Sequence, residues 1–333
     1  MRCFFDDRQL AHAPEVELHN GAFEPFAEHP GRVAAILEAI GRTKPVADRG
    51  EAPILAVHSR DYLDFLRSAH AQWREAGRPG DAIGYAWPVV RRRPVALDRI
   101  DAKLGRYSFD ATSPIAAGTF ESAYWSAQTA LASLDPLLDG ERSAFALCRP
   151  PGHHCGADYL GGYSYLNSAA VAAEAARVVG RKVAILDVDY HHGNGTQDIF
   201  YRNGEILFVS IHADPATDYP FYWGHAEETG EDEGEGATLN LPLPRGTGWA
   251  AYLPALDQAL ERIALFGADL VVCSFGADTY DGDPISHFEL RTGDYALMGR
   301  RIADLRLPVL IVMEGGYAVD ALGENVAAFL AGF

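Results

Sequence analysis

Two segments in the second half of the chain end in side chains that could bind a metal ion. Asp189 and His191 follow the apolar run at 183–186, and Asp278 follows the apolar run at 270–275. If the first pair continues a strand, both side chains leave the same face, and Asp278 at the end of another strand could complete the set. Two carboxylates, one imidazole and an open position suit a catalytic divalent ion. This donor set fits zinc and also iron(II), cobalt or manganese, so the sequence predicts a metal site without fixing the metal.

A pair of adjacent histidines, His153 and His154, follows a Pro-Pro turn in the segment RPPGHH. Asp187 and Asn194 are the natural hydrogen-bond partners of these two rings. A carboxylate raises the pKa of its imidazole partner and fixes the tautomer, whereas an amide orients an imidazole with less charge. The pattern favours acid–base chemistry in which the two histidines need not share one role, and His192 is assigned to structure.

Tyr317 follows Gly315 and Gly316, a flexible turn that lets a side chain reach inward. A phenol at this place could donate a hydrogen bond to a developing oxyanion beside the metal. Together with the two histidines, it turns a metal site of unspecified use into one that is suited to amide hydrolysis.

These residues all follow apolar segments that predict β-strands. The expected strands cover residues 143–150, 182–190, 206–214, 268–278 and 307–316. Their apolar residues run continuously rather than alternating, which is typical of a parallel sheet covered by helices on both faces. Helices are expected at 167–179, 196–201, 249–267, 294–306 and 319–333. We therefore expect an α/β fold with an open parallel sheet of about eight strands, whose carboxyl ends carry the site.

The N-terminal third is less regular. Residues 29–43 and 58–77 predict helices, and a stretch rich in Gly, Pro and Arg occupies about 78–118. A connection of this length is a functional loop or an interface rather than an idle link. No repeat or linker divides the chain, so residues 1–333 are expected to form a single domain with this long loop as an insertion.

The composition limits the class of partner. The 333 residues carry a formal net charge of −18, which argues against a nucleic-acid partner and is compatible with a cationic substrate, although solubility alone would also explain it. No apolar run is long enough for a membrane span, and the N-terminal acids do not fit a signal peptide, so we expect no membrane contact and a cytoplasmic location. The four cysteines form no C-x-x-C pair, which makes a zinc knuckle or dithiol motif unexpected.

At the level of whole motifs, the sequence resembles the histone deacetylase superfamily of the arginase/deacetylase fold, and within it the bacterial acetylpolyamine amidohydrolases. The matching segments span nearly the whole chain and are HSRDYLDFL, RPPGHH, GGYSYLNSAA, AILDVDYHHGNGTQDIFY, SIHADP, SFGADTYDGDP and MEGGY. The loop at 78–118 and the stretch HAEETGEDEGEG point to the polyamine branch. Asn194 stands where many lysine deacetylases have Asp, as in that branch.

The resemblance implies a mechanism for the predicted site. The implied zinc ligands are Asp189, His191 and Asp278. His154 would be the general base that activates water and then the acid that protonates the leaving amine. His153, paired with Asp187, would assist electrostatically, and Tyr317 would stabilise the tetrahedral oxyanion.

The resemblance also implies structural potassium ions and a substrate tunnel. The implied ligands of the potassium ion near the zinc are Asp187, Asp189, His191, Ser210 and the backbone of Ile211. A second monovalent site is implied near Phe200, Asn203 and Ile206. The acyl chain would run past Tyr163 and Tyr219, with the carbonyl of Gly162 and the side chain of Ile285 on the wall. Asp101 and Asp110 are candidates for binding a distal ammonium group.

The function expected on these grounds is zinc-dependent hydrolysis of small acetylated polyamines, such as acetylputrescine or acetylcadaverine, to acetate and free amine. In this branch the long early loop is a dimer element that narrows the tunnel, so a homodimer is expected. The alternative is a deacylase that acts on acetyl-lysine in peptides or proteins, or on another small acyl amide. The preferred chain length, the metal used in the cell and the pathway stay open.

Overall fold

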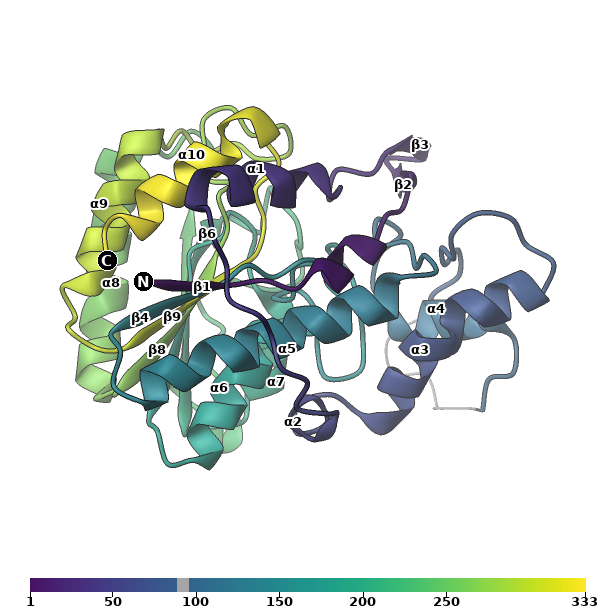
Figure 1. The fold of residues 1–333 in the computed structure, drawn as a ribbon, viewed down its shortest axis with the longest axis horizontal. Helices are drawn as coiled ribbons and strands as arrows, with labels where there is room; N and C mark the ends of the chain where they lie inside the picture. Colours follow the sequence, from purple (N-terminus) through teal and green to yellow (C-terminus); the bar gives the residue numbers. More distant parts are fainter. Residues whose placement is uncertain (89–95) are drawn as a thin grey trace.

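A parallel sheet runs through the part of the chain that the structure describes, residues 1–88 and 96–333 of a computed structural model (Figure 1). Its strands, in spatial order, are β1 (Arg2–Phe4), β4 (Ser143–Ala146), β9 (Val309–Met313), β8 (Leu270–Phe275), β5 (Val183–Asp187), β6 (Ile206–Ala213) and β7 (Thr238–Leu243). All neighbouring pairs in this sheet are parallel. The predicted α/β architecture is therefore confirmed, and among the described residues this sheet has seven strands where about eight were expected.

Both faces of the sheet are buried, which explains why its central strands are continuously apolar in the sequence. On β5, Val183 and Ile185 point into one core, and Ala184 and Leu186 point into the other. Successive side chains of a strand alternate between faces, so a strand that is covered twice must be apolar at every position.

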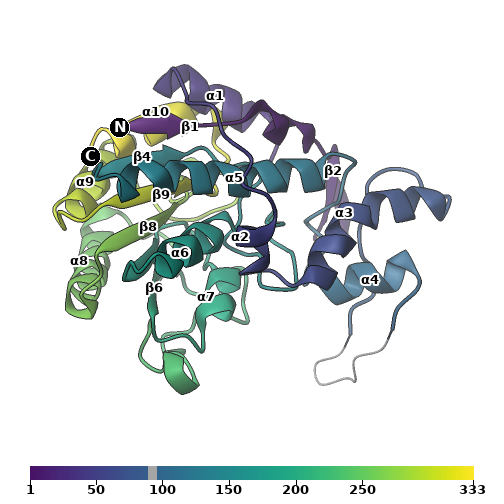
Figure 2. The same ribbon diagram turned by 60° about the horizontal axis from the view of Figure 1, so that its bottom comes forward.

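Two groups of helices cover the two faces. The first core contains residues of α2 (Ala52–Leu55), α3 (Arg60–Glu75), α4 (Ile100–Tyr107), α5 (Thr119–Leu138), α6 (Ser168–Val178) and α7 (Asn194–Phe200). The second contains residues of α1 (Gly31–Ile40), α8 (Trp249–Phe266), α9 (Thr292–Ala303) and α10 (Val319–Leu330). Figure 2 shows α5 and α6 lying against the strands, while α3 and α4 extend beyond the sheet. Among the described residues, none of the helices combines the length and apolar character that a bilayer crossing requires.

Some elements of the N-terminal third were not expected. A short antiparallel hairpin, β2 (Val16–His19) and β3 (Ala22–Pro25), stands apart from the main sheet. The segment expected as a loop at 78–118 contains helix α4, and mutual backbone hydrogen bonds of 3.0 Å between Ala82 and Ile115 close its two ends. Residues 89–95 of this segment lie outside the described part of the chain.

The carboxyl ends of the parallel strands all point to the same edge of the sheet. The turn with the two histidines follows β4, Asp189 and His191 follow β5, Asp278 follows β8, and Tyr317 follows β9. The hairpin β2–β3 lies beyond this edge, on the same side as α3 and α4 (Figure 1). The fold thus brings residues that are far apart in sequence to one place, as expected for ligand sites in open α/β sheets.

Candidate active site

The three predicted metal ligands lie together at the carboxyl edge of the sheet. One ligand atom from each of Asp189, His191 and Asp278 lies within 4.8 Å of the other two. Nδ1 of His191 is 3.1 Å from Oδ2 of Asp278 and 3.5 Å from Oδ1 of Asp189. Both carboxylates are fully buried, and buried carboxylates this close repel each other unless a cation lies between them.

Two glycines leave the space around these carboxylates open. A Cβ atom at Gly276 would lie 1.9 Å from Oδ2 of Asp189, and one at Gly315 would lie 2.5 Å from Oδ2 of Asp278. The amide of Gly315 donates to Oδ2 of Asp189 at 2.9 Å. Two buried carboxylates and an imidazole that converge here fit a divalent metal ion.

The histidine pair makes two different hydrogen bonds. Nδ1 of His153 is 3.0 Å from Oδ2 of Asp187, and Nδ1 of His154 is 2.7 Å from Oδ1 of Asn194. The two rings lie side by side, with centroids 4.0 Å apart, and both are buried. One imidazole therefore has a charged partner and the other a neutral one, as the sequence suggested.

The pKa values of the two histidines are shifted in opposite directions. Burial lowers the pKa of His154 well below its usual value, and the neighbouring rings of His153 and His191 act in the same direction. Burial also opposes the charged form of His153, but Asp189 and Asp187 outweigh it and raise its pKa to about 10. A cation bound at Asp189 would reduce this rise. His154 is thus the ring that is neutral and able to accept a proton.

A buried glutamate that sequence reasoning missed holds the backbone of the histidine turn. Oε2 of Glu314 accepts hydrogen bonds from the amides of Gly152, at 2.7 Å, and His153, at 3.1 Å. The hydroxyl of Ser274 donates to Oε1 at 3.2 Å. Glu314 lies within the motif MEGGY, but its use depends on β4 and β9 being neighbours, which sequence spacing does not reveal.

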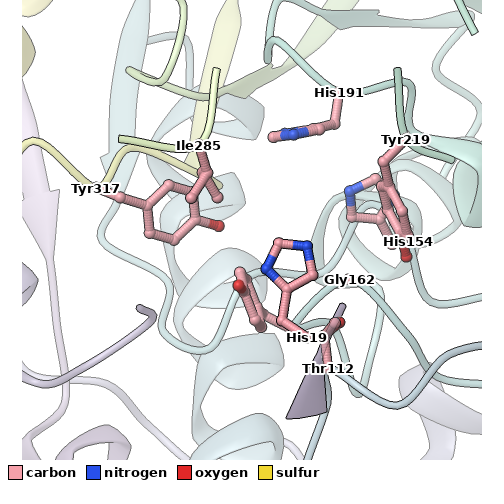
Figure 3. Close-up of a pocket in the computed structure, with 9 residues that line it drawn as sticks. His19, Thr112, His154, Gly162, His191, Tyr219, Ile285 and Tyr317 are labelled. Carbon is pink, nitrogen blue, oxygen red and sulfur yellow. The ribbon is translucent and has the colours of Figure 1, made fainter. Parts of the chain in front are cut away.

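The side chains of Tyr317 and His154 line one cavity of about 130 Å³. Its lining residues are His19, Thr112, His154, Gly162, Tyr163, His191, Tyr219, Ile285 and Tyr317. Figure 3 shows the hydroxyl of Tyr317 pointing into the space that the ring of His191 borders. The amide of Tyr317 donates to Oδ2 of Asp283 at 2.6 Å, and the guanidinium of Arg32 lies 4.9 Å from its ring centroid. The turn after β9 is thereby held with its phenol directed inward.

The cavity wall opposite Tyr317 is organised by Asp110. Its Oδ2 accepts a hydrogen bond from the amide of Gly162 at 2.7 Å and another from the hydroxyl of Tyr219 at 2.7 Å. Gly162 has a φ of +53°, and a Cβ there would lie 2.2 Å from Cδ2 of His154, so the wall requires glycine. Asp110 holds this wall in place, and its expected role as a partner for a distal ammonium stays a prediction.

A second acid missed from the sequence holds Tyr163, which lines the cavity beside Tyr317. Glu17, on strand β2, accepts a hydrogen bond from the hydroxyl of Tyr163 at 2.9 Å. Its other carboxylate oxygen, Oε2, is buried and has no partner among the described residues. Burial raises the pKa of Glu17 to about 7, although the bond from Tyr163 lowers it. No local motif marks this residue, because the hairpin packs on the site only in the folded chain.

Comparison with known proteins identifies the family of this chain. A model of the histone deacetylase domain matches residues 26–333. The chain belongs to this family. Acetylpolyamine amidohydrolase 1 of Pseudomonas aeruginosa is 48% identical over 341 residues, which cover 99% of this chain and 97% of that protein. The acetylpolyamine amidohydrolase of Mycoplana ramosa is 46% identical over 335 residues, covering 99% of this chain and 98% of that protein.

A solved structure agrees with the sequence comparison. The crystal structure of an acetylpolyamine aminohydrolase from Burkholderia pseudomallei has a TM-score of 0.95 to this chain at 40% identity, and the match covers 100% of this chain and 98% of that one. Membership of the histone deacetylase family, expected from the motifs, is therefore confirmed, and so is the fold.

The residues that were expected to bind potassium ions lie in two groups in the structure. Asp187 and Ser210 are directly paired across β5 and β6, next to Ile211. The amide of Asn203 donates to the carbonyl of Phe200 at 2.9 Å, just before Ile206 begins β6. Both groups are compact, and their binding of potassium stays a prediction.

Asp101 is not among the residues that line the cavity. Its carboxylate pairs with the guanidinium groups of Arg78 and Arg99, the latter at 3.0 Å. This acid, expected as a partner for a distal ammonium, is thus occupied by two cations on the same stretch of chain. The long early segment contributes Thr112 and, through hydrogen bonds, Asp110 to the cavity instead.

Proposed function

We propose that the protein hydrolyses the acetyl amide of small acetylated polyamines to acetate and a free amine. The observation that carries this proposal is that one narrow cavity is lined by His154, by Tyr317 and by His191, which belongs to the candidate metal triad with Asp189 and Asp278. A cavity of about 130 Å³ suits a linear acylated amine chain rather than a bulky acyl group. The names of the relatives from Pseudomonas aeruginosa and Mycoplana ramosa support the same substrate class.

The chain's own residues supply the proton transfers. Because Nδ1 of His154 bonds to Asn194, its Nε2 is left for the cavity and takes a proton from the attacking water. The carbonyl carbon becomes tetrahedral, and the hydroxyl of Tyr317 donates a hydrogen bond to its oxyanion. His154 then returns the proton to the amine nitrogen as the C–N bond breaks, and acetate remains. His153, tied to Asp187, stabilises the negative charge that develops.

The residues Asp189, His191 and Asp278 would hold zinc. Zinc bound there supplies a Lewis acid that polarises the acetyl carbonyl and acidifies water. The donor set also accepts iron(II), cobalt or manganese, so metal analysis of the purified protein forms part of the proposal. Potassium ions at Asp187, Ser210 and Ile211, and near Phe200, Asn203 and Ile206, would be structural.

A homodimer that forms through the segment at 78–118 would narrow the entrance to the cavity. Two large aromatic side chains of this segment, Tyr85 and Trp87, are 67% and 40% exposed. Exposed aromatic residues grouped on one segment are typical of protein interfaces. Light scattering should give twice the mass of the 333-residue chain, whereas the mass of one chain would contradict the dimer. The cytoplasmic location stays a prediction.

The function is tested with a panel of monoacetylated diamines of increasing length and acetyl-lysine peptides as comparators. Metal content is measured on the same samples, and released acetate is quantified. We expect chelator-sensitive turnover of the free amines and much lower kcat/KM for the peptides. No metal-dependent turnover of any acetylated amine would overturn the proposal, and preferred turnover of the peptides would favour the alternative deacylase.

A further inference from the structure

The hydrogen-bond partners of His153 and His154 differ in how firmly they fix the position of the ring proton. The carboxylate of Asp187 can only accept a hydrogen bond, so it fixes a proton on Nδ1 of His153 by itself. Asn194 has an oxygen and an NH₂ group at the end of the same side chain, and a rotation of 180° exchanges them. If the amide turned, it would donate to Nδ1 of His154 and leave the proton on Nε2, where it would block the base. Something must therefore hold the amide in the productive orientation.

A hydroxyl group reaches the other end of this amide. Nδ2 of Asn194 lies 3.5 Å from the hydroxyl oxygen of Tyr159, and this hydroxyl donates to Oδ2 of Asp198 at 2.6 Å. Asn194 and Asp198 are four residues apart on α7, so both side chains lie on the same face of the helix. Tyr159 thus contacts two successive turns of one helix, with the amide on one side and the carboxylate on the other.

The direction of each hydrogen bond follows from the chemistry of the groups. Partial desolvation raises the pKa of Asp198 only to about 6, so above neutral pH its carboxylate is ionised and only accepts. The O–H of Tyr159 must then point to Asp198, which leaves the lone pairs of the phenol oxygen for Asn194. Those lone pairs favour the NH₂ group of the amide on that side, and its oxygen therefore faces His154.

We infer that Tyr159 and Asp198 are positioning residues that orient the amide of Asn194 and thereby keep the Nε2 of His154 unprotonated for catalysis. The chain of groups runs from Asp198 at the surface through Tyr159 and Asn194 to the base. This chain of groups fixes the tautomer of His154, as the carboxylate of Asp187 alone fixes the tautomer of His153. This inference rests on the proposed function for its kinetic test, but the tautomer of His154 can be measured without any substrate.

Tyr159 itself is held firmly enough for this role. A Cβ at Gly156 would lie 2.4 Å from the ring of Tyr159, so the turn folds the ring back over a glycine. The carbonyl of Tyr159 accepts a hydrogen bond from the amide of Gly156 at 3.0 Å. Phe109 packs edge-on against the ring at 5.6 Å between centroids, and Trp223 stacks on it at 6.4 Å. The hydroxyl therefore reaches α7 from a ring with little freedom to move.

The test compares Tyr159→Phe in two backgrounds, the wild type and Asn194→Asp. In the wild type, losing the hydroxyl should lower kcat about 10-fold with KM nearly unchanged, as for other groups that orient a site residue. In Asn194→Asp, a carboxylate fixes the tautomer by itself, so adding Tyr159→Phe should change kcat by less than about twofold. Asp198→Asn should also lower kcat, because an amide can donate to Tyr159 and release its O–H to turn toward Asn194.

A spectroscopic readout separates this role from a merely structural one. In protein labelled with ¹⁵N-histidine, the ring shifts of His154 report which nitrogen carries the proton, with and without zinc. We expect Nδ1–H in the wild type at pH 8, a mixture of tautomers in Tyr159→Phe, and Nδ1–H restored in Tyr159→Phe/Asn194→Asp. Tyr124→Phe is the matched control, since Tyr124 also donates to an aspartate, Asp48, at a distance from the cavity.

Several outcomes would overturn the inference. These are a wild-type tautomer of His154 in Tyr159→Phe, an equal loss of kcat in both backgrounds, or a change confined to KM, which would mark Tyr159 as part of the wall around Phe109 and Tyr219. If the wild type hydrolyses no acetylated amine, the proposed function fails, and the ¹⁵N shifts still decide the role of Tyr159 and Asp198.

Discussion

At the scale of single residues, the role of each group in the site follows from the contacts that hold it. Tyr317 is fixed through its backbone amide on Asp283 and through its ring beside Arg32, and its hydroxyl points into the cavity (Figure 3). Burial raises the pKa of Tyr317 well above its usual value, so the phenol keeps its proton at any physiological pH. A protonated, directed phenol is a donor for an oxyanion and not a general base.

Tyr317→Phe tests this assignment. Removing one preorganised donor to an oxyanion typically costs on the order of 100- to 1000-fold in kcat, and we expect a loss in this range or beyond it. KM should change little, because the hydroxyl is used in the transition state more than in the bound ground state. Steady-state kinetics with a monoacetylated diamine measure both quantities.

The same samples carry the controls for Tyr317→Phe. Metal content should match the wild type, since Tyr317 is not among the three predicted ligands. A variant that keeps its metal and its kcat would show that the phenol has no part in the reaction. A variant that loses its metal would instead place Tyr317 among the groups that build the metal site.

At the scale of elements, the turn at Gly161–Tyr163 shows how closely the backbone approaches the base. Gly162 has a φ of +53°, and any Cβ there would collide with the ring of His154. Gly180, which follows the end of α6, has a similar positive φ of +87° with nothing within 4 Å of its Cβ position. The two glycines have the same kind of backbone and differ in their neighbours.

Gly162→Ala and Gly180→Ala therefore form a matched pair. Both place a Cβ in the left-handed region, which should lower the free energy of unfolding by about 1–2 kcal/mol, and Gly162→Ala should lose more because its Cβ also collides with His154. Only Gly162→Ala displaces His154, and a shift near 1 Å can cost about 100-fold in turnover. Urea unfolding and kcat are measured on both variants. Equal kcat in the two would show that the close approach at Gly162 is not needed for catalysis.

Strand β2 of the hairpin carries Glu17, and burial of its carboxyl group disfavours the ionised form. Burial raises the pKa of Glu17 from its ordinary 4.5 to about 7. The folded state then binds this proton more tightly than the unfolded chain, so the stabilisation is present below about pH 4.5 and is lost as the pH rises through 7. Glu17→Gln removes this loss and keeps an acceptor for the hydroxyl of Tyr163.

We expect Glu17→Gln to be no more stable than the wild type near pH 5 and more stable at pH 8, by about 1–3 kcal/mol in the free energy of unfolding. Urea unfolding at the two pH values measures the difference. Glu38→Gln, the same replacement at an exposed position of α1, is the matched control for the loss of one carboxylate. A constant difference between Glu17→Gln and the wild type would mean that Glu17 does not titrate in this window.

The elements also show what the sequence could and could not predict. Continuous apolar runs marked β5 and β8, and polar residues just after them marked the metal site, because both signals are local. The three residues of β1 are too few for a pattern, and β7, with the sequence TLNLPL, is not a continuous apolar run. The use of Asp110 and Glu17 depends on contacts with Gly162 and Tyr163, more than 50 and 140 residues away, which no spacing encodes.

At the scale of the whole molecule, the arrangement depends on the strand order rather than on any one segment. β5 lies between β6 and β8, so its last residue, Asp187, pairs with Ser210 on one side, and His191 just after it meets Asp278 on the other. The histidine turn and Tyr317 come from β4 and β9, the next pair in the sheet. A parallel sheet with this order therefore assembles the base, the metal ligands and the phenol at one edge.

The net charge of −18 adds a property that no single residue carries. A field of this sign concentrates cations near the molecule and raises their rate of encounter. Salt weakens such a field, since the screening length falls from about 30 Å at 0.01 M to about 3 Å at 1 M.

For an acetylated diamine, kcat/KM should therefore fall several-fold as sodium chloride is raised at constant potassium, while kcat stays nearly constant. An acetylated amino alcohol of equal length, which lacks the distal ammonium, should show little change. If both substrates respond alike, salt acts on the protein itself, and the charge of the chain has no part in attracting its substrate.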